Sequence, residues 1–299
     1  MKESNNTAEL YVVATPIGHL GDITLRALET LRTVDLIAAE DTRLTRGLLA
    51  HHGISTRLIA VHEHNERHAA EGIVKLLREG RRVALVSDAG TPGISDPGAI
   101  VVRAVRDAGF RIVPIPGPSA LVAAMSAAGI ESTAFTFAGF LPSAGKERRR
   151  ALEALKSCSE TLVVYESPHR IADCLDDMAG AFGDAAIVVI GRELTKTFET
   201  IVRMNLGEAR AWVAADAHHQ RGEFVVIVDR AAGRAAKDTS TGAPCGAISA
   251  EEQELERTLR VLCAELPLKQ AVAIAVQLTG QKKNRVYDMA LAIKGEAAP

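Results

Sequence analysis

The chain has 299 residues and a formal net charge of −2, with 47% hydrophobic and 24% charged residues. This is the composition of a globular protein of roughly two domains, and it excludes both a disordered chain and a strongly basic one. The sequence has no apolar run near the ~20 residues that a membrane-spanning helix needs. Residues 1–9 are polar and lack the apolar stretch of a secretion signal, and the four cysteines form no CxxC pair. We therefore expect a cytoplasmic protein with reduced thiols and no bound metal.

The first half of the sequence alternates short apolar runs with amphipathic stretches. The expected strands are residues 10–14, 34–38, 58–61, 83–87 and 112–115. The expected helices are residues 25–31, 67–78, 98–107 and 119–127. Continuous apolar strands separated by helices predict a parallel sheet that helices cover on both faces. Such sheets bind ligands at the carboxyl ends of their strands, so the loops that follow strands are the first candidates for a site.

A second set of strands and helices follows. The expected strands are residues 161–165, 186–190, 199–204 and 223–229, and the expected helices are residues 148–157, 170–182 and 207–215. The last two strands flank one short helix and alternate in polarity, which favours a mixed sheet. We expect one α/β domain over residues 1–117, a second over 118–230, and a flexible linker over 231–249.

Residues 250–299 are expected to form a small helical domain. A capping-box pattern at Ser249 and Glu252 begins its first helix, Pro267 and Gly280 bound the second, and residues 284–293 form the third. This spacing is typical of a helix-turn-helix. Five cations against one anion give residues 266–295 a local charge of +4, which favours RNA binding. A packing or dimerisation role explains the segment equally well. The cations predicted to contact RNA are Lys282, Lys283 and Arg285.

Three loops follow strands and contain glycine and proline. ATPIGHLGD at residues 14–22 is not a GxGxxG dinucleotide loop, although its glycines let a ligand approach the backbone. VSDAGTPGISDPG at residues 86–98 is longer than a minimal connection, and its backbone groups could hold an adenosine and a carboxylate. Asp88 and Asp96 could accept hydrogen bonds there. IPGPSA at residues 115–120 forms a stiff corner where Ser119 can cap a helix whose N-terminus attracts a carboxylate.

Charged clusters also stand at strand ends, at residues 40–43, 165–170 and 191–196. A surface ion pair would explain any one of them, but three together favour a shared cleft. A further basic cluster comprises Lys146, Arg148, Arg149 and Arg150, and it is either a solvated helix face or a contact to RNA phosphates. The segment before it is not a phosphate loop, because Glu147 stands where Ser or Thr must bind magnesium. His64 and His68 could share a helix face, but no HExxH pattern accompanies them.

Taken together, these segments resemble a known family. The matching strings are ATPIGHLGD, AAEDTR, VSDAGTPGISDPG, PIPGPSA, GFLP, YESPHR, GRELTK and GEFVV, followed by LPLKQAVAIAVQLTGQKKNRVYDMAL. They are similar to the tetrapyrrole methylase superfamily and, within it, to the 16S ribosomal RNA cytidine 2′-O-methyltransferases. The resemblance runs from about Leu10 to Ile293, and His19 stands where the family usually has Asn.

The resemblance implies two α/β domains with S-adenosylmethionine bound in the cleft between them, and it implies a homodimer. The partner it implies is 16S rRNA in the small ribosomal subunit. The cofactor contacts that it implies are Pro16, Ile17, Asp88, Ala89, Gly90, Thr91, Pro92, Gly93, Ile94, Ser95, Ser119, Ala120, Tyr165, Glu166 and Ser167.

The expected reaction is in-line attack of a ribose 2′-oxygen on the sulfonium methyl group. Alignment and exclusion of water can supply most of the catalysis, with help from a base or a cation. The candidate catalytic residues are Glu166, Glu193, Asp41, Lys196 and Arg43. Three other readings remain: a methylase acting on a tetrapyrrole macrocycle, a non-catalytic ribosome-assembly factor, and a purely structural dimer. The basic tail counts against the first, and the long glycine loops count against the third.

Overall fold

The computed structural model describes residues 8–61, 65–132, 134–158, 160–230, 250–281 and 283–296. The chain divides into two compact units, 1–237 with the two sheets and 238–299 with the last three helices. The expected linker at residues 231–249 lies outside the described residues. Among the residues described, no helix has the length and apolar character needed to cross a membrane.

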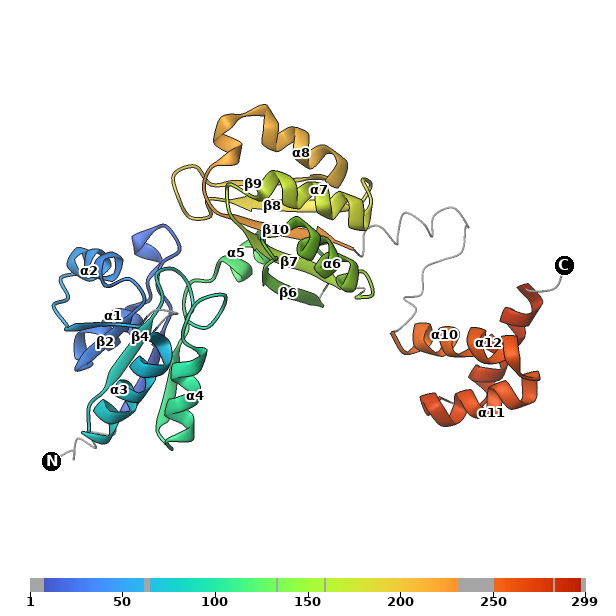
Figure 1. Cartoon of the computed structure of the whole chain (residues 1–299), viewed down its shortest axis with the longest axis horizontal. Helices are drawn as coiled ribbons and strands as arrows, with labels where there is room; N and C mark the ends of the chain where they lie inside the picture. The colour runs from blue at the N-terminus through green and yellow to red at the C-terminus, as the bar shows by residue number, and fades with distance from the viewer. Residues whose placement is uncertain are drawn as a thin grey trace. The chain divides into compact units, whose positions relative to one another are not determined.

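The first sheet is entirely parallel, as the alternating pattern predicted (Figure 1). Its order is β3-β2-β4-β1-β5. The strands are β1 (Glu9–Val13), β2 (Leu36–Ala39), β3 (Leu58–Ala60), β4 (Val83–Val86) and β5 (Arg111–Ile115). β2 and β4 are buried along their whole length because helices pack on both faces of the sheet.

Four helices cover this sheet. They are α1 (Leu25–Thr33), α2 (Thr42–His51), α3 (Glu66–Arg78) and α4 (Ala99–Asp107). Leu31 of α1 and Leu49 of α2 belong to the core on one face, while Ile73 of α3 and Val101 of α4 belong to the core on the other. The buried carboxylate of Glu66 accepts hydrogen bonds from the first turn of α4, which fixes the end of the loop before that helix.

The second sheet is mixed, again as predicted. Its order is β6-β7-β10-β8-β9, and the β6–β7 pair is parallel while the other pairs are antiparallel. The strands are β6 (Phe135–Phe140), β7 (Thr161–Glu166), β8 (Ile187–Arg192), β9 (Thr200–Asn205) and β10 (Phe224–Asp229). The last strand in the chain therefore lies in the middle of the sheet.

The two faces of this sheet are covered unequally. One face packs against α6 (Gly145–Leu155), α7 (Ile171–Phe182) and α8 (Leu206–Ala215) around a core that includes Leu152, Leu175 and Leu206. Among the described residues, the opposite face is covered by the eight-residue helix α5 (Ala120–Ala127). The short 3₁₀ helices η1 (Leu20–Asp22) and η3 (Ala217–Gln220) lie in connecting loops.

The last unit contains three helices around a core of its own, as the capping signals predicted. They are α10 (Ala250–Glu265), α11 (Leu268–Thr279) and α12 (Lys283–Glu296). Leu255, Leu259 and Val272 are buried between them. Gly280 has φ +67° and ends α11 in the left-handed conformation that glycine adopts without strain.

Two elements were not expected. Residues 42–51 form α2, although their charged beginning looked like a cluster at a strand end. Residues 135–140 form β6. Its pairing with β7 shifts register between Phe137 and Phe140, where Gly139 has φ +61°. This irregularity hides the two-residue alternation of side chains that would identify a strand in the sequence.

Candidate active site

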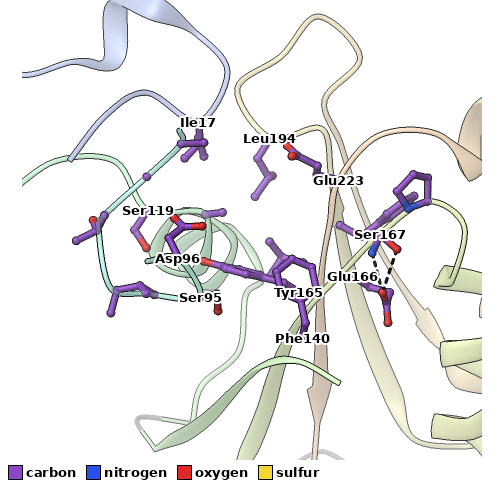
Figure 2. A pocket seen from close by; sticks show the side chains of 18 residues that line it. Ile17, Ser95, Asp96, Ser119, Phe140, Tyr165, Glu166, Ser167, Leu194 and Glu223 are labelled. Atoms are coloured by element: carbon purple, nitrogen blue, oxygen red, sulfur yellow. Dashed lines mark hydrogen bonds between the residues drawn. The ribbon is translucent and has the colours of Figure 1, made fainter. Parts of the chain in front are cut away.

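A cavity of about 330 Å³ lies within the first unit, at the ends of strands from both sheets (Figure 2). Its size falls within the ~300–1,000 Å³ of typical small-molecule sites. The residues that line it are Ile17, Ala89, Gly90, Thr91, Ile94, Ser95, Asp96, Ser119, Ala120, Phe140, Tyr165, Glu166, Ser167, Pro168, Leu194, Glu223, Phe224 and Val225. The strand-end loops predicted from the sequence thus meet at one cavity.

The loops after β1 and β4 are joined by an isolated β-bridge. The N–H of Thr15 donates to the carbonyl of Gly90 at 2.8 Å, and the N–H of Gly90 donates back at 3.0 Å. The hydroxyl of Thr15 donates to Ser87, and that of Thr91 donates to the carbonyl of Pro118. Gly90 lines the cavity and has φ +82°, a backbone conformation that residues with a Cβ rarely adopt. The glycine-rich loop is therefore held rigidly beside the connection to the second sheet.

Asp96 supplies a carboxylate to the wall of the cavity. Burial raises the pKa of Asp96 to about 6, and the negative charges of Glu40, Asp88 and Glu223 add to that rise. A carboxylate among other carboxylates is stabilised by a cation placed beside it. This wall is therefore suited to a positively charged ligand.

Tyr165 of β7 also lines the cavity. Its hydroxyl accepts a hydrogen bond from the N–H of Leu121 in α5 at 3.0 Å, and burial raises the pKa of that hydroxyl. Ser119 is the N-cap of α5 but makes no side-chain capping bond, so the first N–H groups of the helix lie beside the cavity.

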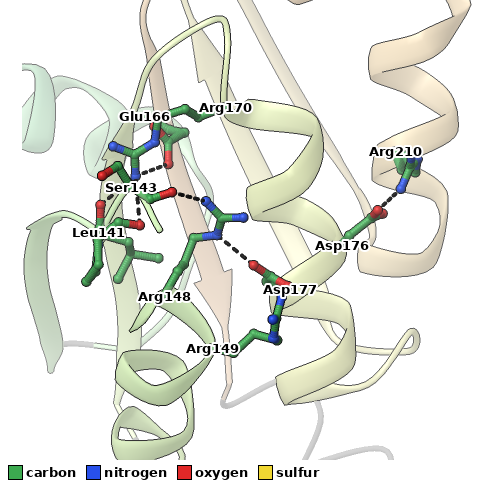
Figure 3. Close-up of polar contacts among 10 residues, drawn as sticks. Leu141, Ser143, Arg148, Arg149, Glu166, Arg170, Asp176, Asp177 and Arg210 are labelled. Atoms are coloured by element: carbon green, nitrogen blue, oxygen red, sulfur yellow. Dashed lines mark hydrogen bonds and ion pairs between the residues drawn. The ribbon is translucent and has the colours of Figure 1, made fainter. Parts of the chain in front are cut away.

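Glu166 lines the cavity, but its carboxylate is fully buried and engaged. It accepts a hydrogen bond from the N–H of Ser167 at 2.7 Å, and it lies 3.1 Å from Nε of Arg170 (Figure 3). A carboxylate held by a guanidinium and a backbone N–H is poorly placed to take a proton from substrate. The general-base role of Glu166 stays a prediction that this geometry disfavours.

Lys196 joins two carboxylates at the rim. Its Nζ lies 2.8 Å from Oε1 of Glu193 and 2.8 Å from Oε2 of Glu223. Burial alone would lower the pKa of Lys196, yet these hydrogen bonds raise it. Burial alone would raise the pKa of Glu193, yet the hydrogen bond from Lys196 lowers it. Both groups are charged at neutral pH, so Lys196 cannot accept a proton there.

The loop that contains Lys196 also reaches the loop after β1. The N–H of His19 donates to the hydroxyl of Thr195 at 3.1 Å. Glu193 and Thr195 have φ of +50° and +64°, which is strained for residues with a Cβ. Strained backbone of this kind gathers at ligand-binding sites, where the surrounding contacts maintain it.

Asp41 and Arg43 lie outside the cavity lining. Asp41 is the N-cap of α2, and hydrogen bonds from Arg43 lower the pKa of Asp41 to about 2. The N–H of Asp41 donates to Oδ1 of Asp88 at 2.8 Å. Asp41 therefore helps to hold the glycine-rich loop, although it does not itself line the cavity. Pro16, Asp88, Pro92 and Gly93 are likewise absent from the lining, although they flank residues that form it.

The lining also includes residues that were not among the predicted contacts: Asp96, Phe140, Pro168, Leu194, Glu223, Phe224 and Val225. Asp96, Phe140 and Pro168 stand within or beside the motifs that were singled out. Phe224 and Val225 fall in the matching string GEFVV, but they belong to a buried strand whose apolar pattern does not by itself mark a site.

The basic cluster near α6 divides in two. Arg148 is only 5% exposed, and its Nε donates to Asp177 at 2.7 Å. The RNA contact at Arg148 stays a prediction that this geometry disfavours, because a buried and ion-paired guanidinium is poorly placed to reach a phosphate. Arg149 also bonds to Asp177 but is exposed, as are Lys146 and Arg150.

Lys283 and Arg285 are exposed on α12, while Lys282, His62 and His64 lie outside the described residues. Within the described ranges, no group of three His, Cys, Asp or Glu side chains could hold a metal ion.

The sequence matches two family profiles. Residues 9–210 match the Tetrapyrrole (Corrin/Porphyrin) Methylases, and residues 249–294 match the RsmI C-terminal HTH domain. Over 291 residues, 97% of each chain, it is 50% identical to ribosomal RNA small subunit methyltransferase I of Escherichia coli O157:H7. Its identity to the protein of the same name from Pseudomonas aeruginosa is 49% over 288 residues, covering 96% of this chain and 98% of that one. The chain belongs to the ribosomal RNA small subunit methyltransferase I family. The family that the motifs resembled is thereby confirmed.

The first unit of this ribosomal RNA small subunit methyltransferase I family member shares its fold with solved tetrapyrrole methylases. Cobalt precorrin-4 methyltransferase CbiF aligns with a TM-score of 0.57 at 18% identity, covering 76% of this chain and 97% of that one. Uroporphyrin-III-C-methyltransferase from Thermus thermophilus aligns with a TM-score of 0.53 at 21% identity, covering 77% and 98%. At these identities the likeness establishes the fold, as predicted.

Proposed function

We propose that this chain catalyses S-adenosylmethionine-dependent methylation of the 2′-oxygen of a cytidine ribose in the 16S rRNA of the small ribosomal subunit. The observation that carries the proposal is the identity of about 50% to ribosomal RNA methyltransferases over nearly the whole chain. That match includes the C-terminal helices, whereas alignments to the precorrin and uroporphyrin methylases leave about a quarter of this chain uncovered. A macrocycle methylase is therefore the weaker candidate.

The residues of the cavity fit S-adenosylmethionine, which supplies a methyl group already activated on a cationic sulfur. The acidic wall around Asp96 suits that positive charge. The start of α5, at Ser119 and Ala120, suits a carboxylate because the N-terminus of a helix attracts anions. Ala89 is within the lining, and its backbone groups could bond the nucleoside. These contacts would orient the donor without a metal ion.

Positioning is the main task of the chain's own residues in this mechanism. Tyr165 and the joined loops after β1 and β4 are rigid, so they can hold a ribose hydroxyl in line with the methyl group. The positive charge of Lys196 is neutralised by two carboxylates. We therefore assign Lys196 to holding the rim loop rather than to stabilising an alkoxide. Asp41 and Arg43 support the glycine-rich loop from outside the cavity.

We further infer that the protein is a homodimer that acts in the cytoplasm, where ribosomal subunits are found. The face of the second sheet that α5 covers supports this assembly. Val122 of α5 is 62% exposed, and Ile201 of the edge strand β9 is also exposed. Light scattering should give twice the chain mass for the wild type, and Val122→Glu should shift it toward the monomer. A wild-type monomer at micromolar concentration would contradict the dimer.

The experiment that tests the function uses methyl-labelled S-adenosylmethionine. The purified protein is mixed with small ribosomal subunits that lack the modification, with naked 16S RNA in parallel, and the label is mapped by nuclease digestion. The expected result is 2′-O-methylcytidine at one site, because a 2′-hydroxyl exists in RNA and not in DNA. Cofactor binding without transfer to either RNA would contradict the proposal and favour a binding-only factor.

A further inference from the structure

Phe140 is an aromatic residue of the cavity wall that the proposed reaction does not yet use. It is the last residue of β6, and 53% of its surface is exposed. Phe224, which also lines the cavity, is only 2% exposed. Phe140 thus combines a place in the cavity lining with a large exposed surface. Single exposed apolar residues are common on proteins, so exposure alone does not mark Phe140 as a contact residue.

The orientation of the ring is fixed by two other aromatic residues. Phe140 packs edge-to-face against Tyr165, with ring centroids 5.8 Å apart and planes at 66°. Tyr165 packs in the same way against Phe137 at 4.9 Å and is anchored to α5 by its hydroxyl. Such edge-to-face pairs have a preferred geometry, so the face of Phe140 is held in one direction (Figure 2).

Hydrogen bonds from an ion-paired guanidinium hold the backbone that follows Phe140 (Figure 3). Nη2 of Arg170 donates to the carbonyl oxygens of Leu141 and Pro142. Arg170 is in turn held by the fully buried carboxylate of Glu166. The ion pair therefore fixes the segment that begins at Phe140, and this gives Glu166 a positioning role.

A second guanidinium extends this support. Nη1 of Arg148 donates to the carbonyl of Ser143 at 3.4 Å, while its Nε bonds to Asp177. Gly139, which precedes Phe140, lies close to Ser95. A Cβ added to Gly139 would be 3.0 Å from the hydroxyl oxygen of Ser95. The exposed ring is consequently mounted on rigid backbone, which lowers the entropy lost when a ligand binds to it.

The chemistry of the substrate indicates what such a ring would contact. In a nucleotide, the ribose C2′ that carries the reacting oxygen is bonded to C1′, which carries the base. A nucleotide whose 2′-oxygen reaches the cavity must therefore place its base beside the cavity edge, out of any helical stack. Proteins recognise unstacked bases by stacking them on aromatic side chains.

We propose that Phe140 is the platform on which the base of the target nucleotide stacks when its ribose enters the cavity. The inference rests on the proposed function for the identity of the substrate. It assigns Phe140 to RNA and not to the wall that encloses the cofactor, because Phe140 is 53% exposed whereas Phe224 of the same cavity is 2% exposed.

The test compares wild type with Phe140→Ala, Phe140→Leu and Phe140→Trp. Phe135→Ala is the matched control, because Phe135 is 43% exposed on the same strand and does not line the cavity. Two quantities are measured for each: the Kd for unmodified small ribosomal subunits with the site saturated by S-adenosylhomocysteine, and kcat/KM for methyl transfer to them. The Kd for S-adenosylmethionine reports on the cofactor site alone.

We expect Phe140→Ala and Phe140→Leu to weaken subunit binding and kcat/KM about ten-fold or more, in line with the usual worth of one stacked base. Phe140→Trp should stay near wild type, Phe135→Ala should not change, and the Kd for S-adenosylmethionine should stay within about two-fold. Unchanged subunit binding in Phe140→Ala, or weaker S-adenosylmethionine binding, would overturn the inference. Phe140-dependent binding without transfer by the wild type would support it while contradicting the proposed methylation. If the wild type binds no subunits, both proposals fail.

Discussion

The side chain of Lys196 lies directly against Gly18. A Cβ added to Gly18 would be only 2.5 Å from Cγ of Lys196. Thr195 and Leu194 also come within about 3 Å of that position. Since Leu194 and Ile17 line the cavity, this contact joins two loops that form its wall. The two loops can make this contact because Gly18 has no side chain.

Gly18→Ala should therefore displace the rim loop. We expect unfolding free energy to fall by about 1–3 kcal/mol, the usual cost of overpacking, and the affinity for S-adenosylmethionine to fall with it. Urea denaturation and calorimetric titration measure the two effects. Gly72→Ala is the control, because a Cβ there meets nothing within 4 Å and should stabilise α3 by about 0.5–1 kcal/mol. Equal behaviour of the two variants would refute the close contact.

Binding of S-adenosylmethionine should depend on pH through Asp96. The pKa of Asp96 in the free protein is raised to about 6, so the carboxylate is ionised above that pH and protonated below it. A cationic ligand needs the ionised form, so affinity should be full near pH 8 and about ten-fold weaker at pH 5. Asp96→Asn should bind weakly at both values, whereas Asp216→Asn should keep the wild-type profile. A wild-type Kd that is constant from pH 5 to 8 would contradict this assignment.

Arg148 and Arg150 should behave differently although they are two residues apart. Arg148→Met leaves the nearly buried Asp177 with one partner, so we expect a loss of about 3 kcal/mol in unfolding free energy. Arg150→Gln should change stability by less than about 0.5 kcal/mol, because Arg150 is exposed. It should instead weaken subunit binding at low salt. Normal stability with lost RNA binding in Arg148→Met would show that the buried pair is not structural.

The C-terminal helices should contribute to RNA affinity through charge. Neutralising Lys283 and Arg285 together should lower the slope of log K against log salt by about 1–2 for small ribosomal subunits. Methyl transfer at saturating subunits should be unchanged, because neither residue belongs to the cavity. Arg257→Gln, which removes one positive charge from the exposed surface of α10, is the control and should change the slope less. An unchanged slope in the double variant would favour a packing role for this unit.

Local patterns predicted most of the fold because apolar runs and turn residues mark strand ends directly. Val83–Val86 is a continuous apolar run that ends at a glycine-rich loop, so both β4 and the position of its loop could be inferred. β6 could not be inferred, because the glycine bulge and the intermediate exposure of residues 136–139 break the alternation that identifies a strand.

The composition of the cavity was harder to predict than the fold. The raised pKa of Asp96 depends on Glu40, Asp88 and Glu223, which come from three separate segments. Phe224 and Val225 reach the site only because β10 inserts between β7 and β8. Strand order of this kind is a long-range property that a local pattern does not contain.

That insertion also sets an order of events during translation. β7 and β8 are synthesised before β10, yet each hydrogen-bonds to β10 rather than to the other. A nascent chain that ends before Phe224 therefore has two open strand edges where the middle of the sheet should be, and such edges favour aggregation. It also lacks Phe224 and Val225 of the cavity wall. In the proposed function, the site for the methyl donor is thus completed only with β10, the six-residue strand of the sheet that is synthesised last, so binding of S-adenosylmethionine would distinguish a finished domain from a truncated one.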